Sequence, residues 1–284
     1  MAAKPWYSLA AGAPLVLALA GGCTVHLGQK NFLPARSTVL PPMPEGLERT
    51  NVELTVAPGV TLRGWHLQRS GAQRVVLFFH GNGAGIQSSD WALHWLAVAL
   101  DADVVAFDDR GYGFSDGQAS IDPIVEDSLR IHAMLRDLGL DTRPLVIVGE
   151  SMGTAPAIHL AASRPAAALV LISPFSSYED LVSAVRRKAP WYAHVAVDGS
   201  LTGLTTSPLA DLPRVTAPTL IVHGTRDELS TDEVVRRVEG ALASPSKVVC
   251  SFPGTHGDAN PTSSEVRTCI EQFASSLASS PRLR

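Results

Sequence analysis

One serine in this sequence lies between glycines in a pattern that can do nucleophilic chemistry. Ser151 is at the centre of Gly-Glu-Ser-Met-Gly, residues 149–153, directly after the apolar run Leu145–Val148 and at the start of the helical stretch Ser151–Ala162. Where a strand leads into a helix through Gly-x-Ser-x-Gly, the glycines leave room for a sharp turn that exposes the serine hydroxyl. The motif alone also occurs as a plain tight turn, but in this context it predicts that Ser151 is a nucleophile.

A serine hydroxyl requires a general base, and the base requires a carboxylate that orients it. His256 fits the base because it lies in a glycine-flanked loop late in the chain, after the apolar run Lys247–Phe252. Asp227 follows the run Thr219–Val222 in a His-Gly-x-x-Asp turn. Side chains that follow parallel strands meet at one edge of a sheet. We therefore predict His256 as the base and Asp227 as the acid.

Two other carboxylates compete with Asp227 for the role of the acid. Glu228 is its neighbour in the sequence, and it should point away if Asp227 faces the imidazole, because consecutive side chains of an extended segment diverge. Asp258 lies two residues after His256, so that reaching the far ring nitrogen is geometrically awkward. We expect Asp258 to be a loop residue near the base.

A second glycine-rich turn predicts donors for a developing oxyanion. Residues 80–85 read His-Gly-Asn-Gly-Ala-Gly and directly follow the apolar run Val75–Phe79. Such a turn leaves backbone N–H groups free to point at negative charge, and we expect Asn82 and Met152 to supply them. No Gly-Lys-Ser/Thr follows, so the turn is not a phosphate-binding loop. No Cys/His cluster has zinc spacing, and we expect neither a metal nor a cofactor.

Strands and helices alternate along most of the chain, which places these residues at strand ends. Apolar, β-branched runs occur at Val52–Val56, Thr61–Leu67, Arg74–Phe79, Asp103–Phe107, Leu145–Val148, Ala168–Ile172, Thr219–Val222 and Lys247–Phe252. Helical stretches lie between them, at Ser89–Leu100, Asp122–Leu138, Ser151–Ala162, Thr231–Leu242 and Ser263–Leu277. The alternation predicts an α/β fold with a mostly parallel sheet of about eight strands, whose first two strands form an antiparallel edge hairpin.

Two segments leave alternatives open. Residues 174–213 contain no clear strand, and we interpret them as a small cap insertion over the nucleophile. Within them, Tyr178–Lys188 can be a cap helix packed on the domain, or a lid that admits acyl chains or touches a lipid surface. The Arg-Gly-Tyr-Gly turn at residues 110–113 can be a structural turn beside the oxyanion loop, or Arg110 or Tyr112 can contact the substrate.

Together these motifs resemble the α/β-hydrolase family over about residues 52–277. The turn at residues 80–83 and the segments Asp109–Gly117 and Ser173–Ser177 are similar to the BEM46/ABHD13/ABHD17-like branch, whose members are serine hydrolases that include protein depalmitoylases. The resemblance implies that Ser151, Asp227 and His256 are the nucleophile, the acid and the base. After the acid, Glu-Leu-Ser replaces the Val-Pro that is usual in the branch, and we expect a changed loop there.

The first residues predict an export signal that precedes the fold. Residues 1–22 carry one charge, Lys4, and an apolar run that is too short for a comfortable membrane span. The small residues that precede Cys23 resemble a bacterial lipobox, although Ala20 stands where leucine is usual. We therefore expect Cys23 to be lipidated. A simple secretory signal or an uncleaved anchor is the alternative. Residues 23–48 predict an extended tether to a hydrolase domain at residues 49–284.

Lipidation of Cys23 would anchor the protein to a membrane of the cell envelope. Thr24, rather than Asp, follows the cysteine, which resembles lipoproteins of the outer membrane in Gram-negative bacteria. An exported chain can form disulfides. Cys250 and Cys269 therefore predict either one disulfide or two separate buried thiols.

Composition excludes several classes of protein. The chain of 284 residues is 45% hydrophobic with a net charge of −4, which excludes intrinsic disorder. Its pI near 6.1 argues against nucleic acid as a partner. The motifs predict a serine hydrolase that cleaves an ester or thioester of a small-molecule or acylated substrate through an acyl-enzyme. The alternatives are a serine peptidase, an acyltransferase and a non-catalytic binding lipoprotein.

Overall fold

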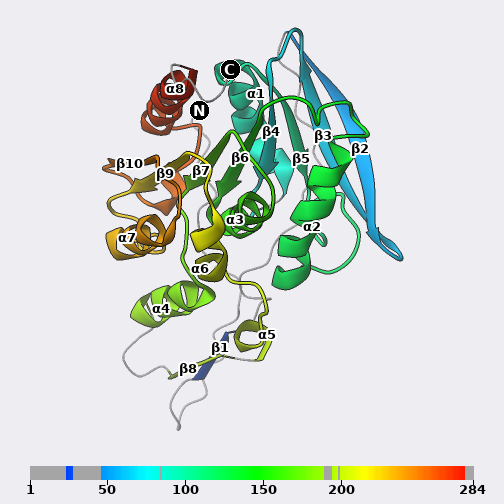
Figure 1. The fold of residues 1–284 in the computed structure, drawn as a ribbon. Coiled ribbons are helices and arrows are strands. Elements are labelled where there is room, and N and C mark those ends of the chain that lie inside the picture. The colour runs from blue at the N-terminus through cyan, green and yellow to red at the C-terminus, as the bar shows by residue number, and fades with distance from the viewer. Residues whose placement is uncertain (1–23, 28–45, 84, 189–193, 198, 279–284) are drawn as a thin grey trace, which may run out of the picture.

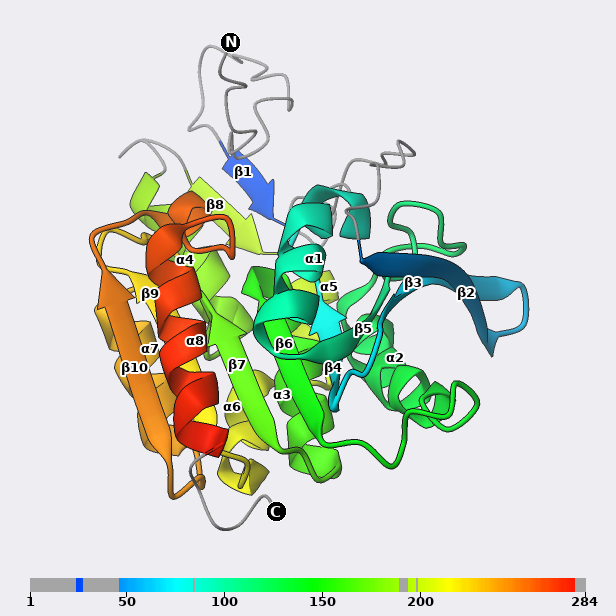
Figure 2. The ribbon, with the colours of Figure 1, turned by 90° about the horizontal axis from the view of Figure 1, so that it is seen from above.

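The computed structural model describes residues 24–27, 46–83, 85–188, 194–197 and 199–278. The predicted signal at residues 1–22, Cys23 and most of the predicted tether lie outside these residues. In the described part, helices cover both faces of one central sheet (Figures 1 and 2). None of the described helices has the length and apolar character that a membrane crossing needs.

The central sheet has eight strands in the order β10-β9-β7-β6-β4-β5-β3-β2. Their bounds are β2 Leu47–Ala57, β3 Val60–Arg69, β4 Arg74–Phe79, β5 Ala102–Phe107, β6 Leu145–Glu150, β7 Ala168–Ile172, β9 Thr219–Gly224 and β10 Lys247–Phe252. Neighbours from β10 to β5 are parallel, whereas β3 is antiparallel to both β5 and β2. The predicted α/β fold with an antiparallel edge hairpin is confirmed.

Helices flank the sheet on both sides because the inner strands are apolar on both faces. Along β4, Val76 and Phe78 belong to the core under α1 (Asp90–Ala99) and α8 (Ser264–Ala278), whereas Val75, Leu77 and Phe79 belong to the opposite core. The opposite face is covered by α2 (Ile121–Met134), α3 (Thr154–Ser163) and α7 (Asp232–Ala241). This alternation follows from the two-residue period of a strand. Figure 2 shows α1 and α8 in front of the sheet and the other three helices behind it.

The cap insertion consists of short elements and contains a strand that the sequence did not predict. Its elements are α4 Tyr178–Lys188, β8 His194–Val197, α5 Gly199–Thr202, α6 Pro208–Asp211 and the 3₁₀ turn Leu212–Arg214. β8 pairs in parallel with β1, Thr24–Leu27, in a separate two-stranded sheet (Figure 1). The prediction of no clear strand at residues 174–213 is therefore wrong at His194–Val197. Each strand has four residues, and its partner is far away in the sequence, so the local pattern carries little signal.

The helix at the start of the insertion packs its apolar side on the domain. Buried side chains of α4, including Tyr178, Leu181 and Val182, form a cluster with Ile121 and Val125 of α2. This arrangement agrees with a cap helix, and the predicted bounds, Tyr178–Lys188, are confirmed.

Candidate active site

Ser151 adopts the sharp backbone turn that the glycine pattern predicts. It follows β6 and begins a 3₁₀ turn, Ser151–Gly153, that leads into α3. Its φ is +50°, in the left-handed region, which costs a non-glycine residue about 1–2 kcal/mol. A Cβ at Gly149 would lie 2.6 Å from the carbonyl oxygen of Gly153 and 2.7 Å from the Cβ of Ala157. A side chain at Gly149 would therefore force the strand and the helix apart.

The structure brings the three predicted triad residues into one hydrogen-bonded series. Ser151 Oγ lies 2.8 Å from His256 Nε2, and His256 Nδ1 lies 2.8 Å from Asp227 Oδ2. Because the carboxylate can only accept, Nδ1 carries the ring proton and Nε2 is free to accept the proton of the serine hydroxyl. The residues come from turns after β6, β9 and β10, whose carboxyl ends lie at one edge of the sheet. The geometry is that of a nucleophile, a base and an orienting acid.

Asp227 is buried and its carboxylate is fully engaged. Oδ2 accepts a hydrogen bond from Ser173 Oγ at 2.8 Å as well as the one from His256. Oδ1 accepts the backbone N–H groups of Leu229 and Ser230, each at 2.8 Å. Burial by itself would raise the pKa of Asp227, but the hydrogen bonds and the imidazole hold that pKa below its usual value. The acid therefore stays ionised and keeps the imidazole oriented.

Neither competing carboxylate is in the position of the acid. Asp258 Oδ2 accepts the N–H of Thr255 at 2.8 Å and its hydroxyl at 2.7 Å, which closes a capping box at the 3₁₀ turn His256–Asp258. These bonds lower the pKa of Asp258. Glu228 is exposed, and its backbone carbonyl accepts a hydrogen bond from Arg187 at 2.7 Å. Of the three carboxylates, Asp227 is the one that is bonded to the imidazole.

The predicted oxyanion turn packs directly on the nucleophile elbow. A Cβ at Gly81 would lie 3.2 Å from the carbonyl oxygen of Glu150 and 3.3 Å from the Cβ of Ser151. The backbone of the turn therefore runs past the serine, and Asn82 is the next residue. Met152 is the second residue of the 3₁₀ turn that Ser151 begins. The roles of the Asn82 and Met152 N–H groups as oxyanion donors stay predictions.

Two buried side chains that the sequence did not single out hold the oxyanion turn in place. His80 accepts the N–H of Asp109 at Nε2, 3.1 Å, and its Nδ1 lies 2.7 Å from the carbonyl oxygen of Gly81. Asp108 accepts the N–H of Ile86 at 2.7 Å and that of Phe114 at 2.9 Å. Both residues link the turn after β4 to the turn after β5. The signal that was available is their place at the ends of adjacent strands.

The Arg-Gly-Tyr-Gly turn makes structural contacts. Arg110 donates two hydrogen bonds of 2.7 Å to the buried carboxylate of Asp127 on α2. Tyr112 is buried, and its ring meets that of His80 edge-on with 4.9 Å between centroids. These contacts agree with the interpretation as a tight turn beside the oxyanion loop.

Glu150 is a titratable group immediately before the nucleophile. Burial raises its pKa to about 7, while His256 and His80 act in the opposite direction. A carboxyl in this environment changes charge in the pH range where a histidine base operates. Its position inside the Gly-x-Ser-x-Gly motif was visible in the sequence, but the packing that leaves the residue only partly exposed and desolvates its carboxyl was not.

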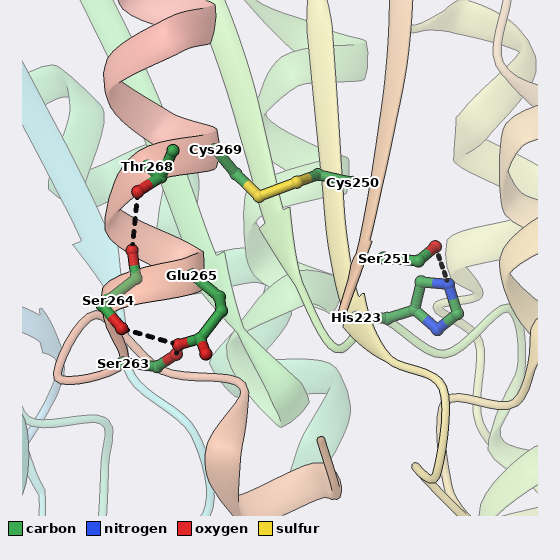
Figure 3. The surroundings of a disulfide bond; sticks show 8 residues. All are labelled: His223, Cys250, Ser251, Ser263, Ser264, Glu265, Thr268 and Cys269. Atoms are coloured by element: carbon green, nitrogen blue, oxygen red, sulfur yellow. Dashed lines mark hydrogen bonds between the residues drawn. A yellow bond between two sulfur atoms is a disulfide. The ribbon is translucent and has the colours of Figure 1, made fainter. Parts of the chain in front are cut away.

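A disulfide joins the two elements on either side of the loop that contains His256, which is called the histidine loop. Cys250 of β10 and Cys269 of α8 are bonded, with 6.1 Å between their Cα atoms and a sequence separation of 19. Figure 3 shows the bond between the strand and the helix, with Ser251 next to Cys250 on β10 and His223 on the neighbouring strand β9. His256 lies within the bridged segment. Of the two alternatives that the sequence left open, the structure has the disulfide.

Space beside the elbow is small and mostly apolar. A cavity of about 10 Å³ is lined by Met152 together with Tyr112, Ile121, Val125 and Tyr178. His80 and Asp109 also line this cavity, which has room for about one water molecule. Among the described residues, no group of three or more His, Cys, Asp or Glu side chains is arranged to hold a metal ion.

Comparison with known proteins identifies the family of the chain. The family model Hydrolase_4, described as "Serine aminopeptidase, S33", matches residues 70–207. An uncharacterized protein of Mycobacterium tuberculosis is 31% identical over 233 residues, which cover 80% of this chain and 76% of that protein. The chain belongs to the α/β-hydrolase family.

Other relatives match over a shorter length. The α/β-hydrolase domain-containing protein aho-3 of Caenorhabditis elegans is 32% identical over 162 residues. The α/β-hydrolase domain-containing protein 17C of Xenopus tropicalis is 29% identical over 161 residues. The alignments cover 54% and 56% of this chain but only 43% and 48% of those proteins. The structure of the Pyrococcus furiosus esterase Pf2001 superimposes with a TM-score of 0.71 at 19% identity, over 86% of this chain and 98% of the esterase. That likeness shows the shared fold.

Proposed function

We propose that the protein is a serine hydrolase that cleaves carboxylic ester or thioester bonds through an acyl-enzyme intermediate. The observation that supports this best is the hydrogen-bonded series from Ser151 through His256 to Asp227, with 2.8 Å at each step. Membership of the α/β-hydrolase family supports hydrolysis in general.

In the proposed acylation, Ser151 Oγ attacks the acyl carbon while His256 Nε2 takes the hydroxyl proton. Asp227 keeps the imidazole oriented and stabilises its protonated form. The N–H groups of Asn82 and Met152 donate to the oxyanion of the tetrahedral intermediate, and each such donor contributes about 3–4 kcal/mol. The imidazolium then returns its proton to the leaving alcohol or thiol, and Ser151 is left acylated. Water activated by His256 hydrolyses the acyl-enzyme and releases a carboxylic acid.

The nucleophile is tested by covalent labelling. Wild-type protein should react with a fluorophosphonate probe and should hydrolyse p-nitrophenyl esters and acyl thioesters of increasing chain length. Ser151→Ala should lose labelling and turnover with a nearly unchanged melting temperature, because the hydroxyl is the reacting group. Labelling that persists in this variant would show that another residue is the nucleophile. An absence of labelling and turnover in the wild type would favour a binding protein instead.

A serine peptidase is the second candidate function. The name of the matching family model, a serine aminopeptidase, favours it. The same series of residues can cleave an amide if the leaving amine is protonated by His256. Amino-acid p-nitroanilides measured beside the ester panel separate the two functions, since a peptidase should prefer the anilides. Transfer of the acyl group to an added alcohol would instead indicate an acyltransferase.

We further propose that the protein is exported and attached to a membrane of the cell envelope through lipidation of Cys23. The apolar run that ends before Cys23 supports this location. The Cys250–Cys269 disulfide supports an oxidising compartment, where such bonds persist. An anchored hydrolase would meet acylated substrates at or near the membrane.

A further inference from the structure

Ser173 lies beside the proposed acid, and the proposed reaction does not use it. It directly follows β7 and is 2% exposed. Its hydroxyl donates to Asp227 Oδ2 at 2.8 Å, and its N–H donates to the carbonyl of Val222 on β9 at 2.8 Å. The hydroxyl and the imidazole N–H of His256 thus share one carboxylate oxygen.

The backbone of Ser173 is in a conformation that serine rarely adopts. Its φ is +48°, in the left-handed region. Glycine adopts this region without steric cost, whereas a residue with a Cβ does not. Strain at a buried polar residue in contact with an active site indicates a functional constraint. Glycine at position 173 would remove the strain, but it would also remove the donor to Asp227.

We propose that Ser173 is a positioning residue that acts through Asp227. The carboxylate has two acceptor oxygens, and each accepts two hydrogen bonds: Oδ1 from the backbone after the acid, and Oδ2 from Ser173 and His256. The backbone donors come from the turn that contains Asp227 itself, whereas Ser173 ties the carboxylate to a different strand. Its hydroxyl therefore fixes the plane of the carboxylate against β7 and takes up part of its negative charge. The kinetic consequences of this inference rest on the proposed function.

The test compares Ser173→Gly and Ser173→Ala with the control Ser176→Ala. Ser176 is also buried and donates from its hydroxyl to a carboxylate, Asp180, at 2.7 Å. Its substitution removes a comparable buried bond three residues further along the chain, to a carboxylate that is bonded to Ser177 and Arg237 and not to a triad residue. Ser173→Gly removes the hydroxyl and relieves the backbone strain together, so it keeps the test informative if Ser173→Ala folds poorly.

Both Ser173 variants should lower kcat/KM by at least about tenfold, which corresponds to about 1.4 kcal/mol, with little change in KM. With fewer donors on its carboxylate, Asp227 should attract the imidazolium more strongly. The acidic limb of the pH profile of kcat/KM should therefore move to higher pH. The proton of His256 Nδ1, observed by NMR far downfield, should also change its chemical shift. Ser176→Ala should change neither the limb nor the resonance.

A Ser173→Gly protein with wild-type kcat/KM, pH profile and Nδ1 resonance would overturn the proposal. Equal effects of Ser176→Ala on these readouts would also overturn it, since a general structural effect would then explain them. The resonance does not depend on turnover. If the wild type shows no hydrolase activity that Ser151→Ala abolishes, the proposed function is refuted. The Nδ1 resonance would still show whether Ser173 positions Asp227.

Discussion

One carboxylate oxygen of Asp227, Oδ2, orients the imidazole of His256. Replacement by asparagine would put an amide where one oxygen accepts both the imidazole N–H and the hydroxyl of Ser173. The neutral side chain can favour the wrong ring tautomer, which lowers turnover about 10⁴-fold in the Ser-His-Asp template. We expect Asp227→Asn to lose several orders of magnitude in kcat on the best ester of the panel. Its melting temperature should change little.

Asp258 and Glu228 provide matched controls. Asp258→Asn removes a charge two residues from His256, but its bonds are to Thr255. Glu228→Gln removes an exposed charge next to Asp227. Each variant should lose less than about tenfold, or about 1.4 kcal/mol, in kcat/KM. If Asp258→Asn lowers kcat/KM by several orders of magnitude and Asp227→Asn lowers it only slightly, the acid is assigned to the wrong strand end.

Glu150 should make the stability of the protein depend on pH. Burial raises the pKa of Glu150 from 4.5 to about 7, so the folded state binds this proton more tightly than the unfolded state. The free energy of unfolding therefore falls as the pH rises from about 4.5 to about 7. Glu150→Gln cannot ionise, and it should be more stable than the wild type by at least about 1 kcal/mol at pH 8. At pH 4 the difference should vanish.

Thermal melts across this pH range measure the effect. Glu271→Gln is the control, because Glu271 is exposed and lies in the middle of α8. Its curve of melting temperature against pH should follow that of the wild type. If Glu150→Gln gives the same curve of melting temperature against pH as the wild type, ionisation of Glu150 does not lower the free energy of unfolding.

At the scale of elements, the disulfide secures the part of the fold that holds the base. β10 is an edge strand that pairs only with β9 in the central sheet, and α8 follows the histidine loop. Closing a loop of this length is expected to contribute about 3 kcal/mol. The double variant Cys250→Ser/Cys269→Ser should melt several degrees lower and should have a lower kcat, because His256 lies inside the bridged segment.

Reduction provides the control for this prediction. A membrane-permeant or soluble reductant should lower the melting temperature of the wild type to that of the double variant and should leave the double variant unchanged. A wild type that is insensitive to reductant, with thiols that react freely under denaturing conditions, would show that the two cysteines are not bonded in the protein.

At the scale of the whole molecule, lipidation would join the fold to a membrane. Wild-type protein expressed in a Gram-negative host should sediment with the membranes and incorporate labelled palmitate. Cys23→Ser should remove both properties, because the thioether that carries the lipid cannot form. Unprocessed wild-type protein in the cytosol would refute the proposed location, but it would leave the proposed chemistry untouched.

Much of the architecture could be predicted from the sequence because its signals are local. A buried parallel strand is a continuous apolar run, and the turn after it shows its glycines and polar residues directly. The elbow at Ser151, the turn after β4 and the loops of Asp227 and His256 were all visible in this way. The carboxyl ends of parallel strands lie at one edge, so the topology predicted that these side chains converge.

Only the tertiary structure decided the features that depend on distant partners. Three contacts join segments whose local sequences do not predict the partner. They are the pairing of β1 with β8, the disulfide, and the hydrogen bond from Ser173 to Asp227. The burial that raises the pKa of Glu150 likewise comes from the packing around it. A local pattern specifies the element and its apolar faces, whereas the identity of each contact depends on how the elements pack in three dimensions.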